Sequence, residues 1–182
     1  MQVHGFFDVS AGKFLKAVLI GGVIIVGIVG LSSLASNLPD TTVVTQKEAY
    51  FPEPTNYVVD SANVIGDDLE VSLNQNLKEF DATAQIAVVT VKTTQPLDEK
   101  QYAIELARKW GIGSAEKDNG VLFLIVTEDR KLRIETGRGA EGVITDSEAG
   151  RILDQHVVPS LKAGNWEEGI KNGVTAIIEE AK

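Results

Sequence analysis

The chain has 182 residues, of which 43% are hydrophobic and 24% charged, so its composition excludes an intrinsically disordered protein and allows one globular domain with an appendage. It has no cysteine and only two histidines, which excludes disulfides, thiolate metal sites and zinc sites built from several histidines. The formal net charge is −9 and the basic residues form no cluster, so nucleic acid is not expected as a partner.

The N-terminal region is predicted to reach a membrane. Residues 17–35 carry no charge, and their number is close to the ~20 that a helix needs to cross the hydrocarbon core. Lys13 and Lys16 precede this run, so residues 1–16 are expected in the cytoplasm and everything after the run outside it, in a periplasmic or extracellular space.

Two interpretations of residues 17–36 remain open. The pattern "SLA" at Ser33 to Ala35, with small residues at its first and third positions, suits a cleaved signal peptide. An apolar run longer than the usual ~7–15 residues instead favours an uncleaved single-pass anchor. We favour the anchor, and the membrane is then the first expected partner. Residues 37–56 contain three prolines and no sustained period, as expected of a linker, and residues 57–182 are the predicted domain.

Four segments of this domain have apolar residues at helical spacing. The apolar stripes run from Leu69 to Phe80, Ala103 to Trp110, Ala149 to Val157, and Trp166 to Ile177. Each has a capping-box-like pair at its start, which would satisfy the free amides of the first turn. The pairs are Asp67 with Glu70, Asp98 with Gln101, Thr145 with Glu148, and Asn165 with Glu168.

Three segments are predicted strands. Residues 85–92 and 120–127 are rich in β-branched residues and almost continuously apolar, which is typical of strands covered on both faces. Residues 131–137 alternate, so Leu132 and Ile134 should face one way and the charged residues between them the other. The short connection before this segment predicts a β-hairpin.

The order strand, helix, strand predicts a right-handed parallel βαβ unit. Together with the hairpin and the last two helices, it gives an α/β fold: a three-layer α/β/α sandwich with a small mixed β-sheet, preceded by an N-terminal transmembrane helix. In this topology the second strand starts at the sheet edge where the third strand ends. We therefore expect Asp118 and Asn119 to lie beside Gly137, Gly139 and Glu141.

Six stretches within residues 57–182 form a recognisable series: "YVVDSANVI", "RKWGIG", "DNGVLFLI", "DRKLRIETG", "EGVITD" and "NWEEGIKNGVTAI". In content and order they resemble the TPM domain family, which is often labelled a phosphatase domain. The resemblance implies a membrane-tied α/β/α domain outside the cytoplasm or in an organelle lumen. Members of this family are linked to acid phosphatase activity, divalent-ion binding, photosystem repair and assistance to a membrane receptor, so the resemblance implies roles of these kinds. Arg138 departs from the pattern, because the family commonly has an aromatic residue there.

The oxygen-bearing side chains at the expected sheet edge are candidate metal ligands. Asp118, Asn119 and Glu141 would supply the oxygens that Ca²⁺ or Mg²⁺ prefers. The alternative is that these side chains only bond the amides of local turns. Gly137 and Gly139 are interpreted as an adaptation of the backbone, because their loop is far shorter than a phosphate-binding P-loop.

Catalysis has few candidate residues. A metal-assisted phosphatase needs a nucleophile or activated water and cationic stabilisation of the phosphoryl group, and only Asp118 and Arg138 are candidates for these roles. We therefore favour a membrane-tethered interaction or assembly and repair factor that binds another membrane protein and a divalent ion. An acid phosphatase acting on phosphomonoesters is the alternative, and a plain ion-binding module is a third.

Overall fold

The computed structural model describes residues 16–20, 23–27, 48–81 and 83–182, and the chain divides into two units, Met1–Thr45 and Gln46–Lys182. In the first unit, β1 (Lys16–Ile20) and β2 (Val23–Gly27) pair as an antiparallel hairpin. Most of the predicted transmembrane segment lies outside the described residues, so the membrane helix stays a prediction. Within the described ranges, no helix combines the length and apolar character needed to cross a membrane.

The second unit is built on a four-stranded mixed sheet, in the order β3-β4-β5-β6. The strands are β3 (Val58–Asp60), β4 (Gln85–Val91), β5 (Gly120–Val126) and β6 (Lys131–Thr136). β3, β4 and β5 are parallel, and β6 runs antiparallel to β5. The α/β fold and the three predicted strands are confirmed. β3 was not predicted, because three residues are too few to show a period.

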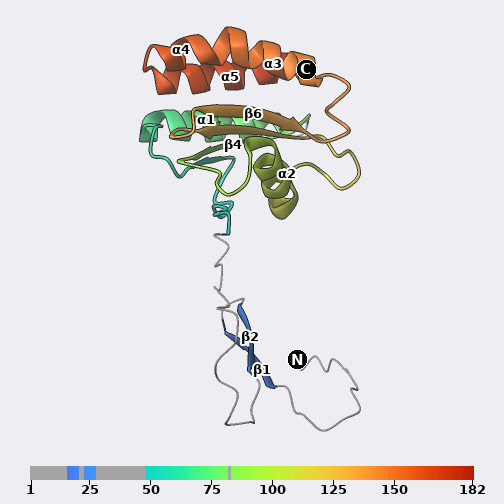
Figure 1. Cartoon of the computed structure of the whole chain (residues 1–182). Helices are drawn as coiled ribbons and strands as arrows, with labels where there is room; N and C mark the ends of the chain where they lie inside the picture. The colour runs from blue at the N-terminus through green and yellow to red at the C-terminus, as the bar shows by residue number, and fades with distance from the viewer. Residues whose placement is uncertain (1–15, 21–22, 28–47, 82) are drawn as a thin grey trace, which may run out of the picture. The chain divides into compact units, whose positions relative to one another are not determined.

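Helices cover both faces of this sheet (Figure 1). The predicted stripes lie in helical segments, and the short helix Val158–Lys162 was not predicted. The helices are α1 (Asp67–Phe80), α2 (Glu99–Trp110), α3 (Asp146–Ile152), α4 (Val158–Lys162) and α5 (Trp166–Glu180). A single π-helical turn, Leu153–Val157, joins α3 to α4. α2 packs on one face, whereas α1 and the C-terminal helices pack on the other.

Alternating side chains of the strands therefore enter two separate cores. Phe123, which is fully buried, and its neighbour Ile134 on β6 face α1 and α5. Leu122 and Leu124 face α2. On β6 the predicted alternation is confirmed, because Leu132 and Ile134 pack on the first core while Arg133 and Glu135 pair with residues that face α2.

The two parallel crossovers have opposite hands. The strands β3, β4 and β5 follow each other in one direction across the sheet, yet α1 and α2 lie on opposite faces. Two right-handed crossovers in this order would place both helices on the same face. One of these two crossovers is therefore right-handed and the other left-handed, whereas the sequence predicted a right-handed one for β4–α2–β5.

Two of the four predicted capping boxes provide the side-chain cap. The Asp98 carboxylate accepts from the Gln101 amide at 2.7 Å, and the Thr145 hydroxyl accepts from the Glu148 amide at 3.2 Å. α1 instead begins after Gly66, whose amide donates to Glu167 of α5. This bond ties the start of α1 to α5, and α1 itself has no side-chain cap.

Residues before β3 pack against α2. The Phe51 ring stacks on Tyr102 with 4.7 Å between centroids, and the Tyr102 hydroxyl donates to the Tyr50 carbonyl at 2.6 Å. The Trp110 indole donates to the Pro52 carbonyl at 2.9 Å. Burial raises the pKa of the Tyr102 phenol, which keeps this donor protonated. Part of the predicted linker is thus packed on the domain.

Candidate functional site

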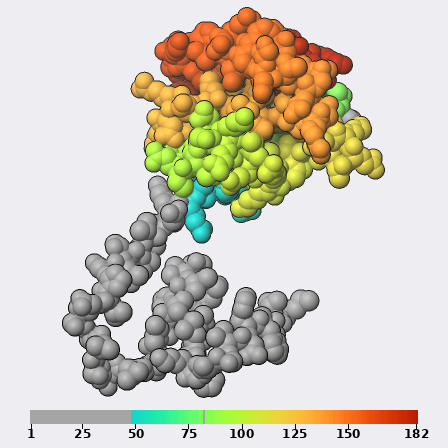
Figure 2. Space-filling view, turned by 45° about the vertical axis from the view of Figure 1, so that its right-hand side comes forward, coloured from blue at the N-terminus to red at the C-terminus, as the bar shows by residue number. Residues whose placement is uncertain are grey.

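The loop after α2 and the end of β6 meet at one edge of the sheet. The Gly137 amide donates to the Gly120 carbonyl at 2.8 Å, and the Gly139 amide donates to the Asp118 carbonyl at 2.9 Å. Figure 2 shows the loop after α2, in yellow, at the surface of the domain. The structure thus brings Asp118 beside Gly137 and Gly139, as the topology predicted.

Close approach of two backbones explains the glycines of this edge. A Cβ atom on Gly139 would overlap the Lys117 carbonyl oxygen, and one on Gly137 would overlap the Asp118 carbonyl oxygen. Neither glycine has a positive φ, whereas Asp118 does, at 49°. The glycines are therefore required by the space between the two segments, which agrees with a backbone role.

The Asp118 carboxylate pairs with Arg138. Its Oδ2 atom accepts from the Arg138 Nε at 3.2 Å and from the Arg138 amide at 3.3 Å. The two side chains are 47% and 89% exposed, so water screens this ion pair. The two candidate catalytic residues thus contact each other, and the Arg138 side chain extends into solvent.

Asn119 uses both ends of its amide group to hold the loop. Its Oδ1 accepts from the Ser114 amide at 3.1 Å, and its Nδ2 donates to the Thr83 carbonyl at 2.8 Å. Gln85 helps by accepting from the Gly113 amide at 2.6 Å. The Asn119 side chain therefore positions the loop that carries Asp118.

Glu141 is exposed, and its amide donates to the Gly137 carbonyl at 3.1 Å. Across the described residues, no group of three or more acidic or histidine side chains is arranged to hold a metal ion. A cation at Asp118 would compete with Arg138, and one at Asn119 would compete with the Ser114 amide. The three predicted ligands do not form a ready coordination group in this conformation, and cation binding there stays a prediction.

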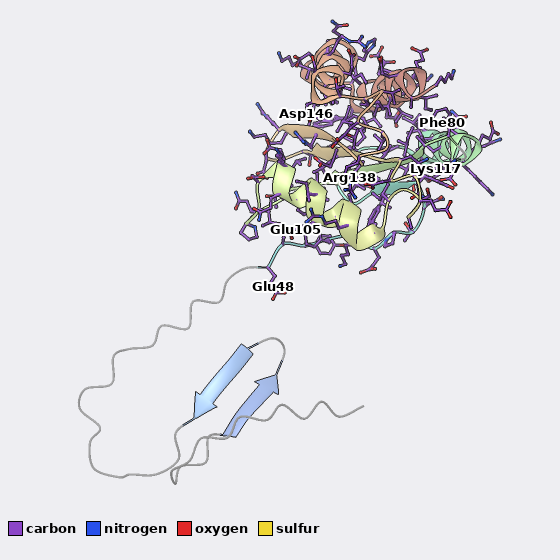
Figure 3. The ribbon with its side chains drawn as sticks, turned by 90° about the vertical axis from the view of Figure 1, so that its right-hand side faces the viewer. Glu48, Phe80, Glu105, Lys117, Arg138 and Asp146 are labelled. Carbon is purple, nitrogen blue, oxygen red and sulfur yellow. The ribbon has the colours of Figure 1, made fainter. Side chains whose placement is uncertain are left out.

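A pocket of about 650 Å³ opens at this edge, between α2 and the end of β6. Its charged lining residues are Arg108, Asp118, Glu135 and Arg138, and residues 111–115 also line it. Glu135 accepts from Arg133 of the same strand at 2.7 Å. Figure 3, which looks onto this side of the domain, labels Arg138 and the neighbouring Lys117. Asn119 and Glu141 are not among the lining residues.

Arg108 and Glu135 were not predicted as site residues. Arg108 lies on the exposed side of α2, where a guanidinium group is usually solvated. Glu135 was placed on the charged side of its strand, but only the packing of α2 over β6 shows that this side lines a pocket.

The chain is similar to a known family model and to solved structures. The model of the TPM domain matches residues 58–180. The solution structure of the N-terminal domain of a protein from P. gingivalis is 31% identical, with a TM-score of 0.64, over 69% of this chain and 82% of that one. A search of curated proteins gave no match.

Two further solution structures share the fold at lower identity. BA42 from Bizionia argentinensis is 18% identical, with a TM-score of 0.56, over 64% of this chain and 81% of that one. The N-terminal domain of cg2496 from Corynebacterium glutamicum is 15% identical, with a TM-score of 0.55, over 76% of this chain and 90% of that one. The family model covers more than half of the chain, and the P. gingivalis domain is similar in sequence as well as in fold. This chain therefore belongs to the TPM domain family.

Proposed function

We propose that this protein is a membrane-tethered factor that acts outside the cytoplasm in the assembly or repair of another membrane protein. Residues 17–36 would anchor it, and the TPM domain would bind a polar segment of the partner in the pocket between α2 and β6. The observation that carries the proposal is the open pocket with two arginines and two acids in its lining.

The charged residues of the pocket suit binding of a charged segment of the partner. Asp118 and Glu135 are each already paired with an arginine of this chain. A charged partner segment could exchange the Asp118–Arg138 pair at small cost, because exposed ion pairs contribute little to stability. Arg108 has no ion-pair partner in the described part of the chain, and it is available to an acid of the partner.

Site-specific photo-crosslinking tests this proposal in native membranes. A photo-reactive residue at Arg138 should crosslink one membrane protein, and the same residue at Gln75, on the exposed side of α1, should not. Arg108→Glu in the first background should abolish the crosslink. Equal crosslinking from both positions, or an adduct that persists with Arg108→Glu, contradicts a specific pocket.

A second function is favoured by the two guanidinium groups of the same pocket. Arg108 and Arg138 could bind a phosphate group, since guanidinium matches phosphate geometry. Asp118 would then be the acid beside the substrate, in a metal-assisted acid phosphatase acting on phosphomonoesters. Ca²⁺ or Mg²⁺ would supply charge stabilisation when bound.

Hydrolysis of a chromogenic phosphomonoester by the purified full-length chain decides between the two functions. The phosphatase requires turnover that rises with Ca²⁺ or Mg²⁺, falls with EDTA and is lost in both Asp118→Asn and Arg108→Ala. Turnover that survives in these variants would come from a contaminant. If Arg108→Glu abolishes the crosslink and the purified chain hydrolyses no phosphomonoester, the assembly factor is supported.

A further inference from the structure

The opposite end of the β5–β6 hairpin forms a second groove. It lies between the β5–β6 turn and the corner where α4 meets α5, and its volume is about 480 Å³. Leu132, Leu161 and the half-buried Trp166 supply apolar surface. Grooves of this size and lining are typical of small-molecule sites.

The charged side chains that line this groove are all basic. They are Arg130, Lys131 and Lys162, and no acid is among the lining residues, although the whole chain has a net charge of −9. Lys131 is 4.0 Å from Glu99, at the limit of an ion pair. Arg130 and Lys162 have no acidic partner among the residues that the structure describes.

Three of the nearby acids have other partners. Asp129 accepts from the Thr93 hydroxyl at 2.8 Å and from the Thr94 amide at 3.2 Å. Glu167 accepts from the Gly66 amide at 2.8 Å. Glu168 accepts from the Asn165 side chain at 3.3 Å. None of these three carboxylates forms an ion pair with Arg130 or Lys162.

The indole group of Trp166 adds an open donor. Trp110 donates its indole N–H to Pro52, but Trp166 has no hydrogen-bond acceptor within the described ranges. Tryptophan at a binding surface commonly combines an apolar ring with one donor of this kind. A ligand that fits this groove would therefore have an apolar body and an anionic group that accepts hydrogen bonds.

We propose that this groove binds a free carboxylate with an aliphatic body of medium length. The chain would pack on Leu132, Leu161 and the Trp166 ring, and the carboxylate would pair with Arg130 and Lys162. This site is separate from the pocket at Asp118, because the two lie at opposite ends of the hairpin and share no lining residue.

Titration of the full chain with decanoate tests the proposal, with ¹⁵N-labelled indole groups as reporters. The chain has two tryptophans, and Trp110→Phe assigns the signals. Decanoate below its micelle concentration should shift the Trp166 signal saturably and leave the Trp110 signal in place. Decylammonium, which has the same chain length and the opposite charge, should bind at least about tenfold more weakly.

The double variant Arg130→Asn and Lys162→Gln should raise the dissociation constant for decanoate at least about tenfold. Asparagine is chosen because Arg130 has a φ of 53°, a conformation that asparagine tolerates. Lys78→Gln on α1, which also removes one exposed positive charge, is the matched control and should leave binding unchanged.

Equal binding of decanoate and decylammonium, or equal movement of both indole signals, would contradict the proposal. Unchanged decanoate binding in the double variant would place the ligand elsewhere, including the apolar residues 17–35, and would overturn it as well. None of these outcomes depends on the partner or the activity proposed for the Asp118 pocket.

Discussion

The two ends of the β5–β6 hairpin are constructed differently. At the end near Asp118, glycines and carbonyl groups of two segments lie in direct contact, and charged side chains of both signs line an open pocket. At the end near Trp166, side chains of β5, β6, α4 and α5 enclose an apolar groove with a basic rim. The first end depends on backbone geometry and the second on side-chain packing, so they should respond to different substitutions.

Phe123→Ala should have the largest effect, because it removes the ring that supports the hairpin between both ends. Phe123 is fully buried, and such truncations cost about 3–5 kcal/mol of unfolding free energy. Chemical denaturation of the full-length chain measures this loss. Val71→Ala, at a side chain that is 67% exposed, is the control and should change stability by less than about 0.5 kcal/mol. A loss below about 1 kcal/mol for Phe123→Ala would mean that β5 is not central.

Gly139→Ala should disrupt the Asp118 end alone. The added methyl group would overlap the Lys117 carbonyl oxygen, so the loop must shift, at a cost of about 1–3 kcal/mol. Gly142→Ala lies three residues further in open space and should be close to neutral. Equal melting temperatures for the two variants would show that the loop adapts freely, and the close contact would then have no structural role.

Ca²⁺ or Mg²⁺ at millimolar concentration should raise the melting temperature slightly if the predicted site at Asp118, Asn119 and Glu141 exists. At ten times the dissociation constant, the stabilisation is about 1.4 kcal/mol. Asp118→Asn should remove the shift. Arg138→Ala should enlarge it, because it frees the Asp118 carboxylate. No shift at constant ionic strength, or the same shift in Asp118→Asn, would eliminate the metal site.

Arg138→Ala without added cation should have the smallest effect, below about 0.5 kcal/mol, because the Arg138 side chain is 89% exposed. Arg133→Ala is the informative comparison, because the side chains of Arg133 and Glu135 are only 24% and 19% exposed and their atoms are 2.7 Å apart. It should cost about 1 kcal/mol in the same denaturation experiment. A larger loss for Arg138 would mean that its ion pair holds the loop.

Patterns within single elements could be predicted from the sequence. The alternation of Leu132 and Ile134 with charged residues predicted the faces of β6, and Asp98 predicted a helix start, because both signals depend on residues a few positions apart. Asp118 was placed beside Gly139 because the topology alone brings these segments together.

Features that depend on distant segments could not be predicted. The acceptor for the Gly66 amide at the start of α1 is Glu167, about a hundred positions away, and the pocket residue Glu135 is explained only by the packing of α2. The groove at Trp166 joins residues of β6, α4 and α5 that share no sequence pattern. The sequence pattern of a crossover helix likewise does not show on which face of the sheet the helix packs, so the hand of the crossover could not be predicted from it.

The edges of the four-stranded sheet influence how the domain behaves at high concentration. One edge is β3, with only three residues, and the other is β6, which carries Lys131, Arg133 and Glu135. Short edge strands and charged edge strands both discourage strand addition by a neighbouring molecule. The almost wholly apolar β5 is thus enclosed between β4 and β6, which protects the folded domain from fibrous aggregation.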